Sequence, residues 1–306
     1  MLSHNKITHL PDRFSDLENL EMLRIANNRL DALPPVLSSL QKLAWIAASG
    51  NPFTDKLLEN LPKRKPNIPE SELELGEEVG RGSGGVTYRS KWMSEDVAVK
   101  IWNDGGMFSD GSPEAEIRSH SFLSHPNLAS AMGTIGESKG LVLRWLTDVH
   151  QLGAPPSLQS VVQDLPPKEG GKFVSFSPDK ILSAASKLAE ALSYMHSLGF
   201  AHGDIYLHNS LEASTASGKV ETYVSDLGAA FPYDRSTCSW LEKTEVLAFG
   251  HLLNDMARFS VIQYGPVDHE GIESIKLVAG KSQHLDADQR PSFASLAAEL
   301  GKLARA

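Results

Sequence analysis

Cysteine is nearly absent from this chain, since Cys238 is the one cysteine among 306 residues. A single thiol excludes an internal disulfide framework and a cysteine-based zinc site, and it favours a reducing, cytoplasmic compartment. Long apolar runs are also missing. No stretch approaches the roughly 18 uninterrupted apolar residues of a membrane span, and Met1 to Leu10 lacks the charged start and apolar core of a signal peptide. We therefore expect a soluble, cytoplasmic protein without membrane insertion.

Positive charge is in deficit, because 29 Lys and Arg stand against 38 Asp and Glu and give a net charge of −9. This balance, with no basic tail, argues against nucleic acid or an anionic membrane surface as the main partner. The chain does have length and apolar content. Its 306 residues, 41% of them hydrophobic, are enough for two domains with real cores.

The N-terminal segment repeats with a period of 23 residues, at which Asn5, Asn28 and Asn51 recur. Apolar positions recur at the same spacing, as in Leu2/Ile25/Ala48, Ile7/Leu30/Phe53, Leu20/Leu43 and Leu23/Ile46. The unit resembles the leucine-rich repeat, in which a short strand turns through an Asn whose amide satisfies neighbouring backbone groups. Only about two full repeats are present, whereas independent stability needs roughly three. Either the second domain supports them or upstream repeats are missing.

Alternation along the repeat strands sends Leu23 and Ile25 inward and Arg24 and Trp45 to the outer, concave face. That face binds partners in leucine-rich repeat proteins, so the resemblance implies a protein or peptide ligand at Trp45 and Arg24. Packing of Trp45 on the adjoining domain is the alternative.

A domain boundary is expected after a closing helix over residues 54–62. Residues 63–71 are expected to form a linker, because the prolines and like charges of Lys63-Arg64-Lys65-Pro66-Asn67-Ile68-Pro69 extend neither a helix nor a strand. The predicted organisation is repeats over 1–62, a linker over 63–71 and a second domain over 72–306. We expect the second domain to fold without the repeats.

The second domain opens with three predicted strands over residues 72–102, which contain a glycine-rich turn at Gly80, Gly82 and Gly85. Glycines let a hairpin backbone approach phosphates without a Cβ clash. Val97-Ala98-Val99-Lys100 lies on the next strand. A helix is expected to begin at Ser112-Pro113, with a capping hydroxyl and a proline in its first turn, and it carries Glu116 nine residues before His125-Pro126-Asn127.

A short helix is expected over residues 157–163 and a long helix from near residue 177. The densest group of reactive side chains follows the long helix. It comprises His202-Gly203-Asp204, Asn209 five residues after the acid, and Asp226-Leu227-Gly228. One carboxylate to orient a hydroxyl and two oxygen ligands for Mg²⁺ are what metal-assisted phosphoryl transfer requires.

These motifs, in this order, resemble the protein kinase family, with HGD in place of HRD and DLG in place of DFG. Arg290-Pro291-Ser292-Phe293 resembles the start of that family's last helix. The resemblance implies an α+β, bilobal domain with an N-lobe over 72–146 and a C-lobe over 147–306, preceded by a short leucine-rich repeat segment of α/β solenoid type. It also implies ATP and Mg²⁺ as cofactors and a protein substrate, phosphorylated on Ser or Thr rather than Tyr.

The resemblance also assigns roles to particular residues. Asp204 orients the acceptor hydroxyl, Lys100 holds nucleotide phosphates, Glu116 fixes Lys100, and Asn209 and Asp226 bind Mg²⁺. The nucleotide is expected to contact Gly80, Gly82, Gly85, Val86, Ala98 and Lys100, and at the hinge between the lobes Arg144, Trp145 and Leu146.

The chain departs from the family at several positions. Gly203 replaces the Arg that reads a phosphate in the activation segment, and Tyr206 replaces the Lys that many Ser/Thr kinases use to neutralise the transferring phosphoryl group. Residues 229–244 make a short activation segment without an Ala-Pro-Glu triplet, so Arg290 lacks its usual glutamate partner. Glu245 is expected to cap the catalytic loop in place of an Asp.

His208 stands where tyrosine kinases carry an Arg, and a catalytic contribution from its imidazole competes with ordinary packing. Three functions remain open: an active protein kinase, a nucleotide-binding pseudokinase or scaffold, and a small-molecule kinase, because HGD also resembles the aminoglycoside and choline kinases. The complete set of Lys100, Asp204, Asn209 and Asp226 favours the first, Gly203 and Tyr206 favour the second, and the His125-Pro126-Asn127 turn argues against the third.

Overall fold

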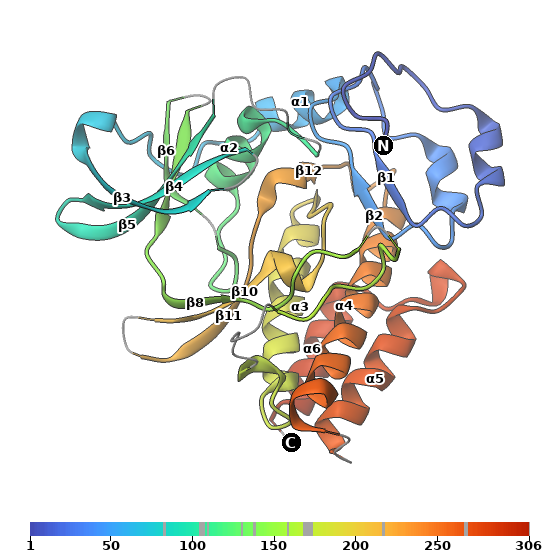
Figure 1. The fold of residues 1–306 in the computed structure, drawn as a ribbon. Helices are drawn as coiled ribbons and strands as arrows, with labels where there is room; N and C mark the ends of the chain where they lie inside the picture. Colours follow the sequence, from blue (N-terminus) through green and yellow to red (C-terminus); the bar gives the residue numbers. More distant parts are fainter. Residues whose placement is uncertain are drawn as a thin grey trace.

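The computed structural model describes residues 1–81, 84–103, 108, 110–129, 131–136, 139–157, 159–167, 174–215, 218–265 and 269–305. A five-stranded sheet and a helical lobe face each other, and the N-terminal repeats lie beside the helical lobe, at the opposite side of the molecule from the sheet (Figure 1). None of the helices in these described ranges is both long enough and apolar enough to cross a membrane.

The repeat segment contains two parallel strands, β1 (Met22–Arg24) and β2 (Trp45–Ala47), preceded by the 3₁₀ turns η1 (Asp12–Asp16) and η2 (Pro35–Ser39) and followed by α1 (Pro52–Glu59). The buried Asn28 amide donates to the carbonyls of Leu2, Ile25 and Ala26, and Asn51 does the same for Ile25 and Ala48. The asparagines predicted from the 23-residue period thus satisfy the backbone at each turn of the repeat.

The repeats share their hydrophobic core with the second domain. Repeat leucines pack in one cluster with Ala201, Phe231, Tyr233 and Leu241, and Trp45 belongs to the core of the helical lobe. The second domain therefore supports the two repeats, which was one of the two expected alternatives. This shared core argues against the expectation that residues 72–306 fold alone, because removing the repeats would expose side chains that are now fully buried, such as Phe231.

The N-lobe is an antiparallel sheet in the order β3-β4-β5-β7-β6. Its strands are β3 (Leu73–Arg81), β4 (Gly85–Trp92), β5 (Glu95–Trp102), β6 (Ala131–Ile135) and β7 (Gly140–Arg144), preceded by η3 (Glu70–Glu72). The helix α2 (Pro113–Phe122) begins as predicted, because the Ser112 hydroxyl accepts the Ala115 N–H.

The segment expected as a linker is packed along this sheet. The Ile68 N–H donates to the Thr134 carbonyl and the Thr134 N–H donates to the Pro66 carbonyl, so this stretch pairs with the edge strand β6. Ile68 is buried with the N-lobe core.

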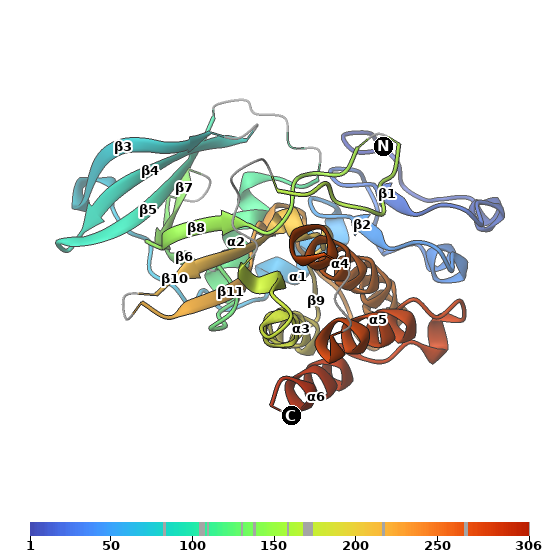
Figure 2. The same ribbon diagram turned by 60° about the horizontal axis from the view of Figure 1, so that its bottom comes forward.

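The C-lobe is built on the buried stripe of α3 (Ile181–Ser197), against which α4 (Trp240–Tyr264), α5 (Glu270–Ser282) and α6 (Phe293–Leu303) pack (Figure 2). Short strands cover its upper end: β8 (Thr147–Gln151), β10 (Ser210–Ser214) and β11 (Val220–Val224) in one sheet, and β9 (Phe200–Ala201) with β12 (Phe231–Pro232) in another. Its 3₁₀ turns are η4 (Val174–Phe176), η5 (Leu207–Asn209), η6 (Leu227–Ala229) and η7 (Ala287–Gln289).

The short helix predicted over 157–163 is wrong. The described part of this stretch forms turns and a bridge between Ser157 and Ser160, and a further bridge joins Ala154 to Leu165. The Val161 carbonyl accepts a hydrogen bond from the Tyr206 hydroxyl at 2.7 Å. Tertiary contacts of this kind override a weak local helical pattern.

Candidate active site

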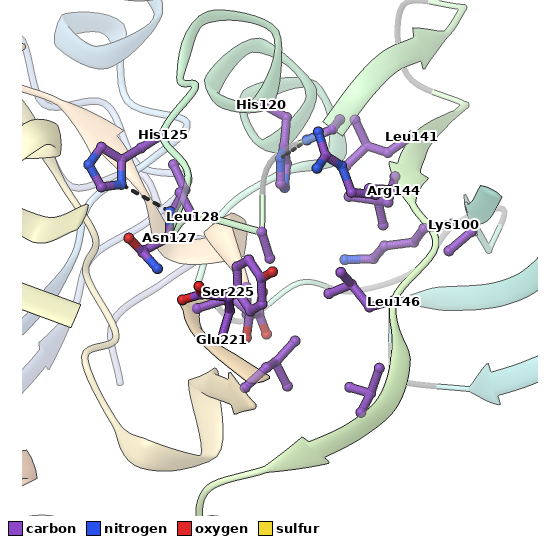
Figure 3. A pocket seen from close by; sticks show the side chains of 18 of the residues that line it. Lys100, His120, His125, Asn127, Leu128, Leu141, Arg144, Leu146, Glu221 and Ser225 are labelled. Carbon is purple, nitrogen blue, oxygen red and sulfur yellow. Dashed lines mark hydrogen bonds between the residues drawn. The ribbon is translucent and has the colours of Figure 1, made fainter. Parts of the chain in front are cut away.

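A cleft of about 1990 Å³ lies between the two lobes. Figure 3 shows Lys100 and Leu146 on one side of it and Asn127 and Leu128 on the other. Most of the residues predicted to form the site line this cleft: Gly80, Gly85, Ala98, Lys100, Glu116, Arg144, Trp145, Leu146, Asp204 and Asp226. Val86, His208 and Asn209 are not among the lining residues, and the side chains of Val86 and Asn209 are buried. Gly82 lies outside the described residues.

Lys100 and Glu116 form the expected ion pair, with Lys100 Nζ 2.7 Å from Glu116 Oε1. Strand β5 presents Lys100 between Thr87 of β4 and Leu141 of β7. Burial acts to lower the pKa of Lys100, but the carboxylates of Glu116 and Asp226 outweigh burial and raise it. Lys100 is therefore cationic at neutral pH, as a group that neutralises phosphate must be.

The helix α2, which carries Glu116, is held by the repeats and the residues after them. The His4 ring contacts the Phe108 carbonyl, and the Asn27 amide donates to the Gly111 carbonyl at 2.7 Å, just before the helix begins. At the other end, Lys65 Nζ donates to the Leu123 carbonyl at 2.6 Å. These contacts fix the helix in the position at which Glu116 reaches Lys100.

The catalytic loop requires glycine at position 203. Gly203 has φ +81°, and a Cβ there would lie 2.6 Å from the Ala229 carbonyl oxygen, so an arginine is excluded on both counts. The buried Glu245 carboxylate accepts the N–H groups of His202 at 2.9 Å and Gly203 at 2.6 Å, and it also pairs with His196 at 2.8 Å. Glu245 thus caps the loop as expected.

Asp204 and the two predicted Mg²⁺ ligands are joined by short contacts. Asn209 Nδ2 donates to Asp204 Oδ2 at 2.8 Å, and both the N–H and the hydroxyl of Ser225 donate to the Asn209 carbonyl at 2.9 Å. Ser225 immediately precedes Asp226, so these bonds hold Asn209 beside Asp226. Burial raises the pKa of Asp204, and the nearby Arg24 guanidinium opposes this effect.

The donor set fits Mg²⁺ as it is bound together with a nucleotide. Within the described residues, no group of three His, Cys, Asp or Glu side chains is placed to hold a metal ion. Mg²⁺ in phosphoryl-transfer sites is bound by one or two protein oxygens together with substrate phosphates, and not by an all-protein cage. The amide of Asn209 and the carboxylate of Asp226 match that requirement.

His208 is held in place by Asp164 and Tyr206. Its Nδ1 lies 2.9 Å from Asp164 Oδ1, its backbone N–H donates to Asp164 Oδ2 at 2.8 Å, and its ring stacks on Tyr206. The Asp164 carboxylate is buried, so this pair fixes the imidazole within the loop. The geometry favours the packing alternative.

The expected partner-binding face of the repeats is covered by the chain itself, which corrects the prediction for Trp45 and Arg24. Trp45 is 2% exposed, its Nε1 donates to the Ile205 carbonyl at 2.9 Å, and its ring stacks on Tyr206 with centroids 4.6 Å apart. Arg24 Nη2 lies 3.6 Å from Asp204 Oδ1. Both side chains point away from the repeat core, as predicted, but they contact the catalytic loop of the same chain and not a separate partner.

Arg290 has backbone partners in place of the glutamate that the short activation segment lacks. It donates to the carbonyls of Gln41 at 2.6 Å, His284 at 2.9 Å and Lys243 at 3.1 Å. The contact with Gln41 again involves a repeat residue. Sequence reasoning missed Gln41 because nothing in the repeat pattern distinguishes it from any other exposed polar position.

Comparison with known proteins agrees with this architecture. Residues 73–248, more than half of the chain, match the family model described as protein kinase domain, and residues 1–53 match the model described as leucine rich repeat. The chain belongs to the protein kinase family, and its kinase domain follows a leucine-rich repeat segment.

Relatives of both substrate classes are similar to it. A probable serine/threonine-protein kinase of Dictyostelium discoideum is 32% identical over 47% of this chain and 10% of its own length. Tyrosine-protein kinase TXK of Homo sapiens is 26% identical over 72% of this chain and 42% of its own, and serine/threonine-protein kinase CTR1 of Arabidopsis thaliana is 26% identical over 62% and 24%. The chain thus spans less than half the length of these relatives.

Proposed function

We propose that this protein transfers the γ-phosphoryl group of ATP to a hydroxyl group of a protein, on Ser or Thr in preference to Tyr, in a reducing cytoplasmic compartment. The observation that carries the proposal is that Lys100, Glu116, Asp204 and Asp226 line one cleft. Lys100 is paired with Glu116, and Asp204 is held from behind by the buried Asn209. Family membership supports the same activity.

In this proposal each polar side chain of the site has one task. Lys100 neutralises nucleotide phosphates and Glu116 positions Lys100, while Asn209 and Asp226 hold Mg²⁺, which supplies positive charge where the phosphates become more negative. Gly80 and Gly85 bring backbone N–H groups near the phosphates, and Ala98 with the hinge residues Arg144 to Leu146 receives the base.

The reaction exchanges one bond to phosphorus for another. The substrate hydroxyl, oriented by Asp204, forms a new O–P bond to the γ-phosphorus as the bond from phosphorus to the β–γ bridging oxygen breaks. The bond's electron pair leaves with ADP, and Asp204 accepts the hydroxyl proton. The raised pKa of Asp204 suits this step, because burial makes its carboxylate a better proton acceptor than an exposed one.

We further propose that residues 1–62, 63–71 and 72–306 act as one functional unit, with the repeats and the linker supporting the kinase domain. The contacts of His4 and Asn27 just before α2, and of Lys65 at its end, support this view. A protein ligand of the repeats would then bind outside the surface that Trp45 and Arg24 occupy.

The test combines binding with turnover. Mg²⁺ and ATP should raise the melting temperature of the full chain, because a ligand that binds only the native state stabilises it by mass action. Phosphoryl transfer to generic protein substrates and to Ser, Thr and Tyr peptides should be lost in Asp204→Asn, while Mg²⁺·ATP still stabilises that variant. Nucleotide binding without turnover by the wild type would instead identify a pseudokinase, and transfer only to sugars or aminoglycosides would identify a small-molecule kinase.

A further inference from the structure

The catalytic loop contains no strongly basic side chain. Residues 202–209 include neither lysine nor arginine. Tyr206 is buried and donates its hydroxyl to the Val161 carbonyl, and burial raises its pKa, so this phenol stays neutral. The His208 ring is held by Asp164. Lys100 approaches from the N-lobe, so the loop of residues 202–209 brings no lysine or arginine to the reacting centre.

Arg24 brings a cation to that place from the repeat segment. It lies at the end of β1, and its guanidinium reaches across the junction between the repeats and the kinase domain. Its Nη2 lies 3.6 Å from Asp204 Oδ1, and its Nη1 pairs with Asp110, next to the N-lobe segment that leads into α2. The exposed fractions of the Arg24 and Asp204 side chains are 18% and 16%, so this ion pair is largely shielded from water.

We propose that Arg24 is a catalytic residue, supplied by the repeats, whose guanidinium stabilises the negative charge on the phosphoryl group during its transfer. This inference rests on the proposed kinase function. The step is the bond exchange described above, in which Asp204 takes the hydroxyl proton and ADP leaves with the electron pair. A cation beside the base lies next to the acceptor hydroxyl. Positive charge at this place stabilises the transition state more than the bound substrate, because negative charge on the phosphoryl group is redistributed there during transfer.

The geometry fits a catalytic group better than an inhibitory lock. A separation of 3.6 Å exceeds hydrogen-bond length, so Arg24 leaves Asp204 Oδ1 able to accept a hydroxyl proton. Asn209 holds the other oxygen, Oδ2, at 2.8 Å. Asp110 fixes the guanidinium from the opposite side, which pre-orients it without occupying Asp204.

The repeats are packed firmly against the kinase domain through a shared core and hydrogen bonds. Trp45, on the neighbouring strand β2, is 2% exposed and bonded to the backbone beside Asp204. Arg290 holds the Gln41 carbonyl at 2.6 Å, and the repeat core is continuous with Phe231 and Leu241. Moving the repeats away would expose this core, so strand β1 keeps Arg24 beside Asp204.

The test compares Arg24→Met, Arg24→Lys and Asp110→Asn with Arg29→Met. Arg29 is an exposed arginine of the same repeat, so its substitution removes the same charge at a position remote from the Asp204 contact. Each variant is first checked by its thermal melt, and kcat and the KM for ATP are then measured. We expect Arg24→Met to lower kcat about 100-fold or more with little change in KM. Arg24→Lys should have a kcat between those of Arg24→Met and the wild type. Asp110→Asn should lower kcat less than Arg24→Met does, and Arg29→Met should have the kcat of the wild type.

A second readout does not depend on turnover. ADP with Mg²⁺ and aluminium fluoride mimics the transferring phosphoryl group, so the wild type should bind it more tightly than Mg²⁺·ADP. Arg24→Met should reduce that gain in affinity by the same factor as kcat and leave Mg²⁺·ADP binding within about twofold, since the effect belongs to the transition state.

Each contrary outcome has a distinct meaning. A kcat that rises in Arg24→Met would show an autoinhibitory contact, and an unchanged kcat with unchanged analogue affinity would show packing only; either overturns the proposal for Arg24 while the kinase function stands. A wild type without turnover would refute the kinase function, and analogue binding that does not depend on Arg24 would then refute this inference as well.

Discussion

Replacing Trp45 with alanine should destabilise the whole chain, because this one side chain joins the repeats to the catalytic loop. The indole is 2% exposed, stacks on Tyr206 with ring planes 1° apart, and lies 5.5 Å from the His251 ring. Its Nε1 donates to the Ile205 carbonyl, which would lose this partner in the variant.

The size of the effect follows from these contacts. Truncating a buried Trp to Ala costs about 3–5 kcal/mol through lost burial and the cavity that remains. A buried carbonyl left without its donor adds about 1–3 kcal/mol. We therefore expect the free energy of unfolding to fall by about 5 kcal/mol. With an unfolding entropy of about 2.1 cal/mol/K per residue, that loss lowers the melting temperature of a chain of this length by about 8 °C.

The assay is equilibrium denaturant unfolding of the full chain, together with Trp45→Phe and Trp92→Ala. Trp45→Phe keeps an aromatic ring but loses the hydrogen bond, so it should cost about 1–2 kcal/mol. Trp92 is only partly buried in the N-lobe. Trp92→Ala should therefore lower the free energy of unfolding by less than half as much as Trp45→Ala. The shared core predicts one cooperative transition. A loss below about 1 kcal/mol for Trp45→Ala, or separate transitions for repeats and kinase domain in the wild type, would refute this docking of the repeats.

Three further predictions concern the control and stability of the site. Burial opposes ionisation of Glu245, but its bond with His196 and the N–H groups that it accepts outweigh burial and lower its pKa below the ordinary 4.5. Its stabilising contribution is therefore full above about pH 4.5 and is lost as the pH falls through the lowered value, so Glu245→Gln should melt at lower temperature at pH 7 and show a shallower acid dependence than the wild type. Glu116→Gln should lower kcat at least about tenfold, since Lys100 loses its counter-charge, and should leave the fold intact by circular dichroism; full activity would show that the pair is dispensable. Phosphorylation of the short activation segment should not switch activity on, because Gly203 provides no arginine to receive a phosphate. Phosphatase-treated wild type and a triple alanine variant should both keep their turnover, and a tenfold loss in either would contradict this reading. The three replaced residues are Ser236, Thr237 and Ser239.

Local sequence signals predicted most elements correctly because each rests on short-range physics. Three strands form over residues 72–102 as predicted, the start of α2 follows from a serine cap and a proline, and the repeat turns follow from asparagines at a 23-residue period. The helix predicted over 157–163 failed where a distant hydroxyl, that of Tyr206, takes up a backbone carbonyl. Periodicity carries no information about such a partner.

The order and spacing of motifs determined the family, the two lobes and the pairing of Lys100 with Glu116, because these depend on a chain path that the motifs specify. Tertiary structure alone decided what covers the repeats. Alternation predicted that Arg24 and Trp45 face outward, but the partner of an outward side chain is set by long-range packing, which a local pattern does not encode. The shared core brings Trp45 onto Ile205 and Arg24 to Asp204, and so joins the repeats to the reacting centre.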